Sequence, residues 1–311
     1  MNRTRAALRR IGALGAALAA AGAAWGDELV LPCHGPDGNP VANTVTLAIL
    51  ENNGGELLRG TGQDGRCRIA LPAGAYWVKA EAPGMRSVAI RVVDAAASGR
   101  ELRMHPLSGI DTDGQQRLQQ MVERDQAVRK SLAETQQLGN ADLIGRAERE
   151  MEQVDSVHRA EIGLWLQERG FPHAAEVGYA GVGAFWLLLQ HAPELLAPQL
   201  PAMRAAVAAG ELSRSSLALS EDRVDLIQGR PQRYGSQLQS GADGKLGLYR
   251  LALPESVDAR RAEMDLEPLA AYLERFGLRV DDSSVPEMAA SSPSQPASTR
   301  SSTRSKSSAP P

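Results

Sequence analysis

Near Gly109 the hydrophobic period of this chain changes, and no other property of the sequence limits the possible folds as strongly. Between Leu29 and Leu107, short runs of alternating apolar and polar residues are separated by turn sequences such as Pro36-Asp37-Gly38. Period two over several short runs predicts an all-β sandwich. After Gly109, apolar residues recur at helical spacing among Gln, Glu and Arg. The chain is therefore expected to be multidomain, with a β-sandwich followed by a mainly α domain.

The first 26 residues have the organisation of a secretory signal peptide. Four arginines and an apolar run from Ile11 to Ala24 precede a small-x-small cleavage site, Ala24-Trp25-Gly26. The run is shorter than the roughly 20 residues that a membrane-spanning helix needs. We therefore expect a periplasmic or secreted protein that starts near Asp27 and has no membrane span after signal cleavage. An uncleaved membrane anchor is the alternative.

The charge of the expected mature chain argues against one class of partner. Loss of the leader removes four positive charges and takes the formal net charge from −3 to −7. Binding to phosphates of nucleic acid requires a concentrated basic surface, which such a composition lacks. We therefore expect no nucleic acid partner.

The chain has only two cysteines, Cys33 and Cys67, and both fall in the expected β-sandwich. In an exported protein, such a pair predicts one disulfide. Two separately buried thiols are the alternative.

Composition and periodicity divide the chain into five segments. Residues 1–26 are the signal peptide, 27–108 the sandwich, 109–139 an amphipathic helix or linker, 140–281 the helical domain and 282–311 a disordered Ser/Pro-rich tail. The tail either contacts the anionic cell wall or has no role. The further elements that we expect are a helix capped by Asn140 and ending at Arg169, a buried core helix in "YAGVGAFWLLLQHA", helices over 198–209, 216–228 and 259–276, and a hairpin around residues 241–244.

The β-sandwich segment contains four short motifs in a characteristic order: Asp37-Gly38-Asn39-Pro40-Val41, Asp64-Gly65, Leu71-Pro72-Ala73-Gly74-Ala75-Tyr76 and Ala82-Pro83-Gly84-Met85. In these motifs the segment resembles carboxypeptidase regulatory-like, transthyretin-like domains. That resemblance implies a non-catalytic module that serves as a spacer or in adhesion and presentation.

Three stretches of the helical segment are "GFPHAAEVGYAGVGAFWLLLQHA", "DRVDLIQGRPQRYGSQ" and "VDARRAEMDLEPLAAYL". Together they resemble a bacterial domain-of-unknown-function family, numbered 6624, with a Gly-x-x-Gln-x-Tyr-Gly-Thr/Ser-Gln motif. The resemblance spans residues 125–277 and brings no known activity. Ser236 stands where the family tends to have Thr, and Phe171 where Trp is frequent. The matching positions are Gly170, Pro172, Gln190, His191, Asp222, Arg223, Gly229, Gln232, Tyr234, Gly235, Gln237, Asp258 and Arg261.

The polar residues of these motifs predict a cleft. We expect it between the end of the helix that contains Trp186, the helix that contains Asp222 and a strand that contains Tyr234. In the main hypothesis, this cleft binds a peptide- or glycan-like ligand of the cell envelope. The side chains expected to bind it are Arg223, Gln232, Tyr234 and Gln237.

Two other functions fit the same residues, so the sequence leaves open whether the protein is an enzyme. A hydrolase would use His191 as general acid or base and Asp222 to orient it, although no nucleophile elbow, HExxH or phosphate loop accompanies them. Alternatively, the polar cluster is a purely structural hydrogen-bond lock. No cofactor is expected, and no metal site, because His158, His173 and His191 lack ligand spacing.

Overall fold

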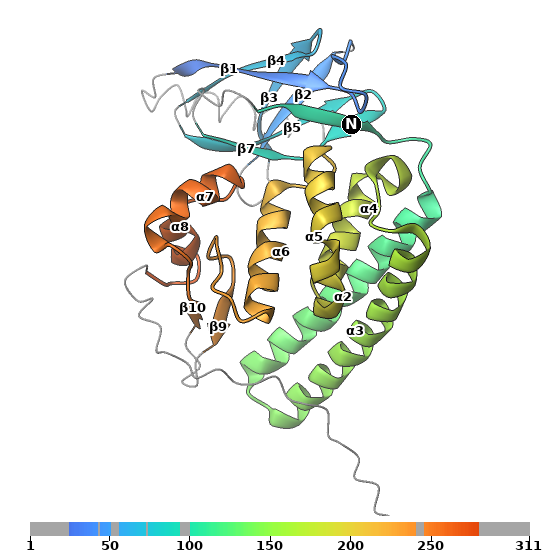
Figure 1. Cartoon of the computed structure of the whole chain (residues 1–311), viewed down its shortest axis with the longest axis vertical. Helices are drawn as coiled ribbons and strands as arrows, with labels where there is room; N and C mark the ends of the chain where they lie inside the picture. Colours follow the sequence, from blue (N-terminus) through green and yellow to red (C-terminus); the bar gives the residue numbers. More distant parts are fainter. Residues whose placement is uncertain are drawn as a thin grey trace, which may run out of the picture.

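The computed structural model describes residues 25–42, 44–50, 56–72, 74–93, 100–240 and 246–279. Strands make up the N-terminal part and helices most of the remainder (Figure 1). Residues 1–24 of the expected signal peptide and the tail at 282–311 lie outside the described residues. Among the helices that are described, none is both long and apolar enough to cross a membrane.

The described strands of the N-terminal region form one sheet, in the order β2-β3-β4-β1-β8-β6-β5-β7. Because β2 also pairs with β5, the sheet closes on itself like a barrel. The prediction of an all-β N-terminal region is thus confirmed. The strands are β1 (Trp25–His34), β2 (Val45–Leu50), β3 (Glu56–Gln63), β4 (Arg66–Pro72), β5 (Ala75–Ala82), β6 (Met85–Ser87), β7 (Ile90–Val93) and β8 (Leu102–Pro106).

The interior of this sheet follows from the alternation in the sequence. In β1, Leu29, Leu31 and Cys33 are buried while Val30 between them is exposed, as expected for side chains that point to opposite faces of a strand. Cys33 forms a disulfide with Cys67 of β4. The predicted disulfide is therefore confirmed, and it joins two neighbouring strands of the closed sheet.

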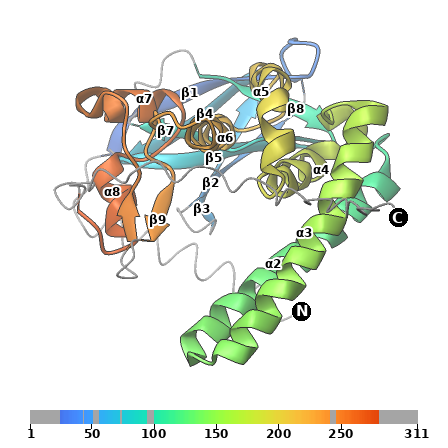
Figure 2. The same cartoon turned by 60° about the horizontal axis from the view of Figure 1, so that its bottom comes forward.

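Two long helices, α2 (Thr112–Leu138) and α3 (Ala141–Arg169), form an antiparallel hairpin that projects from the rest of the molecule (Figure 2). Asp111 and Asn140 cap their N-termini through side-chain hydrogen bonds to backbone N–H groups. Gly139 and Gly170, both with positive φ, end the two helices. The helix predicted between Asn140 and Arg169 is confirmed.

The core of the helical domain is built around α4 (Ala174–Leu189), the predicted core helix. Its residues Phe185, Leu188 and Leu189 are buried. They pack with α5 (Pro193–Ala208), α6 (Arg214–Ile227) and α2, which contributes Leu118 and Met121. Helix α2 is thus part of the same core, although its sequence also fitted a linker.

Two predicted helices differ in the structure. Helix α5 begins at Pro193 rather than Pro198, because proline is tolerated in the first turn of a helix. The helix expected over 259–276 is broken into α7 (Val257–Glu263) and α8 (Leu269–Glu274), since Pro268 disfavours a continuous helix. The remaining described elements are β9 (Leu238–Ser240), β10 (Leu246–Leu248) and a short 3-10 helix, η1 (Pro254–Ser256). Strands β9 and β10 pair antiparallel, which confirms the predicted hairpin.

The β region sits on one end of the helical domain, against α5, α6 and α7 (Figure 1). The hydroxyl of Tyr179 in α4 donates to the backbone oxygen of Arg103 at 2.9 Å. The ring of His105 lies with Nε2 3.1 Å from the backbone oxygen of Ala209. These contacts join β8 to the helices.

Candidate functional site

Asp222 of α6 organises the loop that contains the family motif. Its side chain has no exposed surface (0%). Oδ1 accepts hydrogen bonds from the backbone N–H groups of Arg233 (2.7 Å) and Tyr234 (3.0 Å), and Oδ2 accepts one from Ser236 (2.9 Å). Burial raises the pKa of Asp222, and these N–H donors oppose the rise.

The strand that we expected around Tyr234 does not form. In a strand, the backbone N–H groups of this segment would bond to a neighbouring strand. Here the N–H of Tyr234 donates its hydrogen bond to Asp222 instead. Around this position only Gln232 makes an isolated bridge, to Leu251. The alternating pattern was therefore misleading, because a side-chain acceptor from α6 replaces the ladder.

Gln232 is also completely buried (0%). Its Nε2 donates to the backbone oxygens of Gln237 (3.1 Å) and Tyr249 (2.9 Å), and its Oε1 accepts from the N–H of Gln237 at 2.9 Å. The amide therefore binds the chain itself on both sides and is not available to a ligand.

Tyr234 is held at both ends. Its hydroxyl donates to Oε2 of Glu221 at 2.9 Å, and its backbone oxygen accepts from Nη1 of Arg261 at 2.6 Å. Burial and the neighbouring Glu221 carboxylate raise the pKa of Tyr234. We call Asp222, Gln232, Tyr234 and Arg261 the Asp222 lock, since together they fix the loop to α6 and α7.

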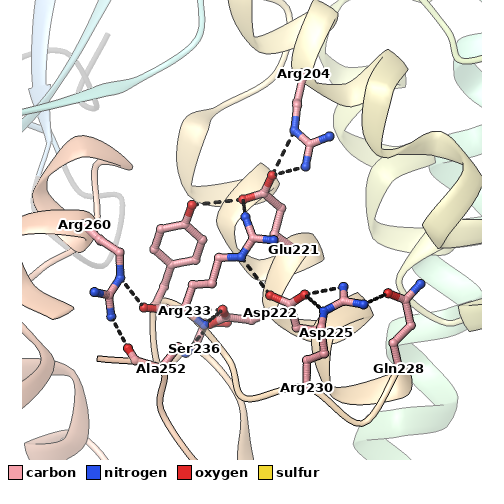
Figure 3. A network of polar contacts seen from close by, with 11 residues as sticks. Arg204, Glu221, Asp222, Asp225, Gln228, Arg230, Arg233, Ser236, Ala252 and Arg260 are labelled. Atoms are coloured by element: carbon pink, nitrogen blue, oxygen red, sulfur yellow. Dashed lines mark hydrogen bonds and ion pairs between the residues drawn. The ribbon is translucent and has the colours of Figure 1, made fainter. Parts of the chain in front are cut away.

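Ion pairs surround the lock on the acidic face of α6 (Figure 3). Glu221 accepts from Nε of Arg204 at 3.0 Å. Asp225 accepts from Nε of Arg230 and Nε of Arg233, each at 2.9 Å. Glu221 and Asp225 are thus each matched by arginine, which is the pattern of a structural network.

His191, which follows α4, lies in a different environment. Its Nδ1 is 2.7 Å from Oδ1 of Asp125 in α2. The expected pairing with Asp222 is not formed, because both oxygens of Asp222 bind the motif loop. The His191 side chain is 22% exposed and that of Asp125 only 1%. Among the described residues, Nε2 of His191 has no hydrogen-bond partner, so this nitrogen is available to a ligand.

Asp125 is kept ionised by its neighbours. Burial favours the neutral acid, but hydrogen bonds from His191 and Arg129 outweigh burial and lower the pKa of Asp125 to about 2. A carboxylate that stays charged holds the imidazole through Nδ1.

Arg129 connects this pair to α3. Its Nη2 lies 2.7 Å from Oδ1 of Asp155 and 3.1 Å from Oδ1 of Asp125. Donor atoms of Asp125, Asp155 and His191 lie within 4.8 Å of one another, close enough to share a metal ion. However, the guanidinium already bridges the two carboxylates, so a cation would have to displace it.

Arg223 of α6 is a partly buried cation beside this group. Its Nη1 donates to the backbone oxygen of Gln190 at 2.6 Å and its Nη2 to Oε1 of Gln237 at 3.2 Å. Both acceptors are neutral, and no carboxylate in the described chain pairs with it. Burial and the nearby Arg129 lower the pKa of Arg223. We call Asp125, Arg129, His191, Arg223 and Gln237 the His191 site.

The structure thus separates the residues that the sequence grouped together. Asp222, Gln232 and Tyr234 belong to the interior lock, whereas His191, Arg223 and Gln237 lie at the partly exposed His191 site. Asp125 and Arg129 are not among the residues that the sequence motifs predict. A signal exists for Asp125, because it falls on the apolar stripe of α2, between two buried residues, Met121 and Val128.

Comparison with known proteins identifies the helical part only. A sequence model described as a family of unknown function, DUF6624, matches residues 112–281, which begin at the first residue of α2. No curated protein matches the chain, and no solved structure does. The match covers more than half of the 311 residues. The chain therefore belongs to the DUF6624 family of unknown function.

Proposed function

We propose that this protein is exported and that its helical domain binds an anionic group of a cell-envelope peptide or glycan at the His191 site. In this proposal the β region is a transthyretin-like spacer without catalytic residues. The observation that carries the proposal is Arg223, a partly buried guanidinium whose hydrogen bonds go only to neutral oxygens. Buried arginines are normally paired with an acid, so an acid supplied by a ligand would complete the pairing.

The neighbouring groups suit such a ligand. Arg223 follows the lock residue Asp222 directly, and its contact with Gln190 places it beside His191. Arginine binds carboxylates through two parallel N–H donors, and Nε2 of His191 can add a third hydrogen bond. The ligand class is therefore a carboxylate, carried by a peptide or a sugar.

The Asp222 lock gives the site its rigidity. Gln237 contacts Arg223, and the buried amide of Gln232 holds its backbone on both sides. Oε1 of Gln232 accepts from the N–H of Gln237, and Nε2 donates to its backbone oxygen. A binding site gains affinity when its groups are fixed before the ligand arrives. In this proposal the motif residues of the Asp222 lock have a structural role, and those of the His191 site bind the ligand.

Export is supported by two features of different kinds. The N-terminal sequence has the organisation of a signal peptide, and the disulfide between Cys33 and Cys67 is compatible with an oxidising compartment.

A thermal-shift screen of the mature protein tests the proposal. Carboxylate-bearing envelope peptides, muropeptides and acidic sugars should raise the melting temperature, whereas their amidated or neutral counterparts should not. Arg223→Gln should abolish the shift. The matched control is Arg146→Gln, which removes an exposed arginine of α3. This variant should retain the ligand-dependent rise in melting temperature. A screen in which acidic and neutral compounds behave alike contradicts the proposal.

The second candidate function is acid–base catalysis, and one observation favours it. His191 is oriented through Nδ1 by a buried carboxylate and leaves Nε2 open, which is the arrangement of a general base. Asp125 would then take the orienting role that the sequence analysis gave to Asp222. His191→Gln should eliminate turnover of any hydrolysed ligand without weakening its binding more than a few-fold.

A further inference from the structure

A second candidate site lies between the β region and the helical domain, and none of its lining residues belongs to the His191 site. A cavity of about 320 Å³ opens there, a size at the lower end of small-molecule sites. Trp77 of β5 and Arg91 of β7 form its wall on the β side. On the helical side the lining includes Arg261, Tyr272 and Arg275, together with the bend between α7 and α8.

The bend that closes the cavity is the segment where the predicted helix breaks. Asp265 has a positive φ of 58°, a conformation that costs energy for a residue other than glycine. The β region holds the bend in place, because Arg100 forms an ion pair with Asp265 and Nη1 of Arg91 donates to the backbone oxygen of Leu266 at 2.8 Å. The cavity is therefore a product of the contact between the two regions.

Two aromatic residues line this cavity, and the ring of one, Tyr272, is held by its contacts. The hydroxyl of Tyr272 donates to the backbone oxygen of Ser236 at 2.9 Å, and the Arg261 guanidinium lies over its ring, 5.0 Å from the centroid. Trp77 stands in the middle of β5, paired with Arg91 of β7. Aromatic residues are only 4% of this chain, so two of them on one small cavity are a specific feature.

The charges around the cavity do not cancel locally. Asp265 is paired with Arg100, and Glu267 with Arg275 at 2.9 Å. Arg91 and Arg261 remain, and their hydrogen bonds in the described chain go only to backbone oxygens. Two lining guanidiniums thus lack an acid in direct contact, which favours a ligand with a negative charge.

We propose that this interdomain cavity binds a sugar ring that carries a carboxylate. A pyranose offers C–H faces that pack on aromatic rings, and its hydroxyls and carboxylate can accept from Arg91. The buried guanidinium of Arg261 adds positive charge beside them. Eight of the ten lining residues have a polar group in the side chain, and only Leu219 and Leu266 do not. The hydroxyls of a sugar can use such groups and the ring of an aromatic acid cannot, which favours the sugar.

The test is to titrate the mature protein separately with glucuronate, glucose and benzoate. Binding is measured by calorimetry and by tryptophan fluorescence. Glucuronate should bind at least tenfold more tightly than glucose or benzoate, and it should change the fluorescence of Trp77. Trp77→Leu should remove both signals. Trp165→Leu, which alters another partly buried tryptophan on α3, should keep glucuronate binding.

Because Trp77→Leu could disturb β5, Arg91→Gln serves as a second variant. It should weaken the binding of glucuronate at least tenfold and leave the binding of glucose the same. His191→Gln should leave glucuronate binding unchanged, which separates this site from the one proposed above. Absence of glucuronate binding, binding that survives in both cavity variants, or tighter binding of benzoate would overturn the proposal.

Discussion

His191 and Asp125 stand 66 residues apart in the chain, yet their side chains meet at 2.7 Å at the junction of α2 with the end of α4. The carboxylate is buried and the imidazole partly exposed. The contact therefore ties the projecting helical hairpin to the core helix and leaves one ring nitrogen open at the surface.

This contact should make stability depend on pH. The pKa of Asp125 is lowered to about 2 in the folded protein, below the value of about 3.9 for an unfolded chain. Because the pKa is lower in the folded protein, the ionised carboxylate stabilises the fold when the pH is above the pKa of the unfolded chain. This stabilisation is lost as the pH falls towards the pKa of the folded protein. Asp125→Asn should therefore cost about 2 kcal/mol at pH 7, and the difference from the unmodified protein should shrink between about pH 4 and pH 2.

Urea unfolding at a series of pH values measures this difference. Glu123→Gln, an exposed acid on the same helix, should change little at any pH. A deficit for Asp125→Asn that is the same at pH 2 and pH 7 would contradict the account.

Asp222 should be among the most sensitive positions of the helical domain. Asp222→Ala leaves three backbone N–H groups of the motif loop without their acceptor, and each such buried donor costs about 1–3 kcal/mol. We expect a loss of at least about 3 kcal/mol in the free energy of unfolding. Glu274→Gln, at an exposed position of α8, serves as the control. Similar unfolding midpoints for the two variants would show that the lock does not hold the loop.

Two glycines of α4 should respond to alanine in opposite directions. Gly178 has φ 67°, and a Cβ there would lie 2.7 Å from Nε2 of Gln115, so Gly178→Ala should destabilise by more than about 1 kcal/mol. Gly183 has nothing within 4 Å of the added carbon, so Gly183→Ala should stabilise by about 0.5–1 kcal/mol. Helix α4 is kinked at Gly178, where the backbone is not helical. Thermal unfolding of both variants tests the prediction, and a stabilising Gly178→Ala would contradict this kink.

The disulfide should account for a large part of the stability of the β region. Cys33 and Cys67 are separated by 34 residues, and closing a loop of that length stabilises by about 3–4 kcal/mol on the chain-entropy model. Reduction should lower the free energy of unfolding of the β region by about that amount and so lower its unfolding midpoint, as should Cys33→Ser with Cys67→Ser. Unfolding followed by far-ultraviolet circular dichroism with and without reductant measures it. An unchanged midpoint would argue against this contribution.

The sequence predicted the elements whose signals are local. Period two gave the all-β region, and the cap at Asn140 with Gly170 gave the bounds of α3. Local patterns failed where a contact between residues far apart in the sequence determines the structure. The segment around Tyr234 alternates like a strand, but Asp222 takes the backbone donors that a strand would use.

The candidate site shows the same division. The motifs predicted His191, Arg223 and Gln237 as site residues. They did not predict Asp125, since no feature of the sequence near it indicates a contact with the end of α4. The break before α8 had a local signal, Pro268, which the prediction of one helix over 259–276 did not take into account.

The central claim is that Arg223 and His191 form one anion-binding site. The most direct measurement is nitrogen NMR of the histidine rings in the mature protein during titration with acetate, the simplest carboxylate, with the His191 signals assigned by His191→Gln. The account predicts a saturable shift of the Nε2 resonance of His191 that Arg223→Gln abolishes and Arg146→Gln preserves. An unresponsive His191 resonance, or a shift that persists without Arg223, would contradict it.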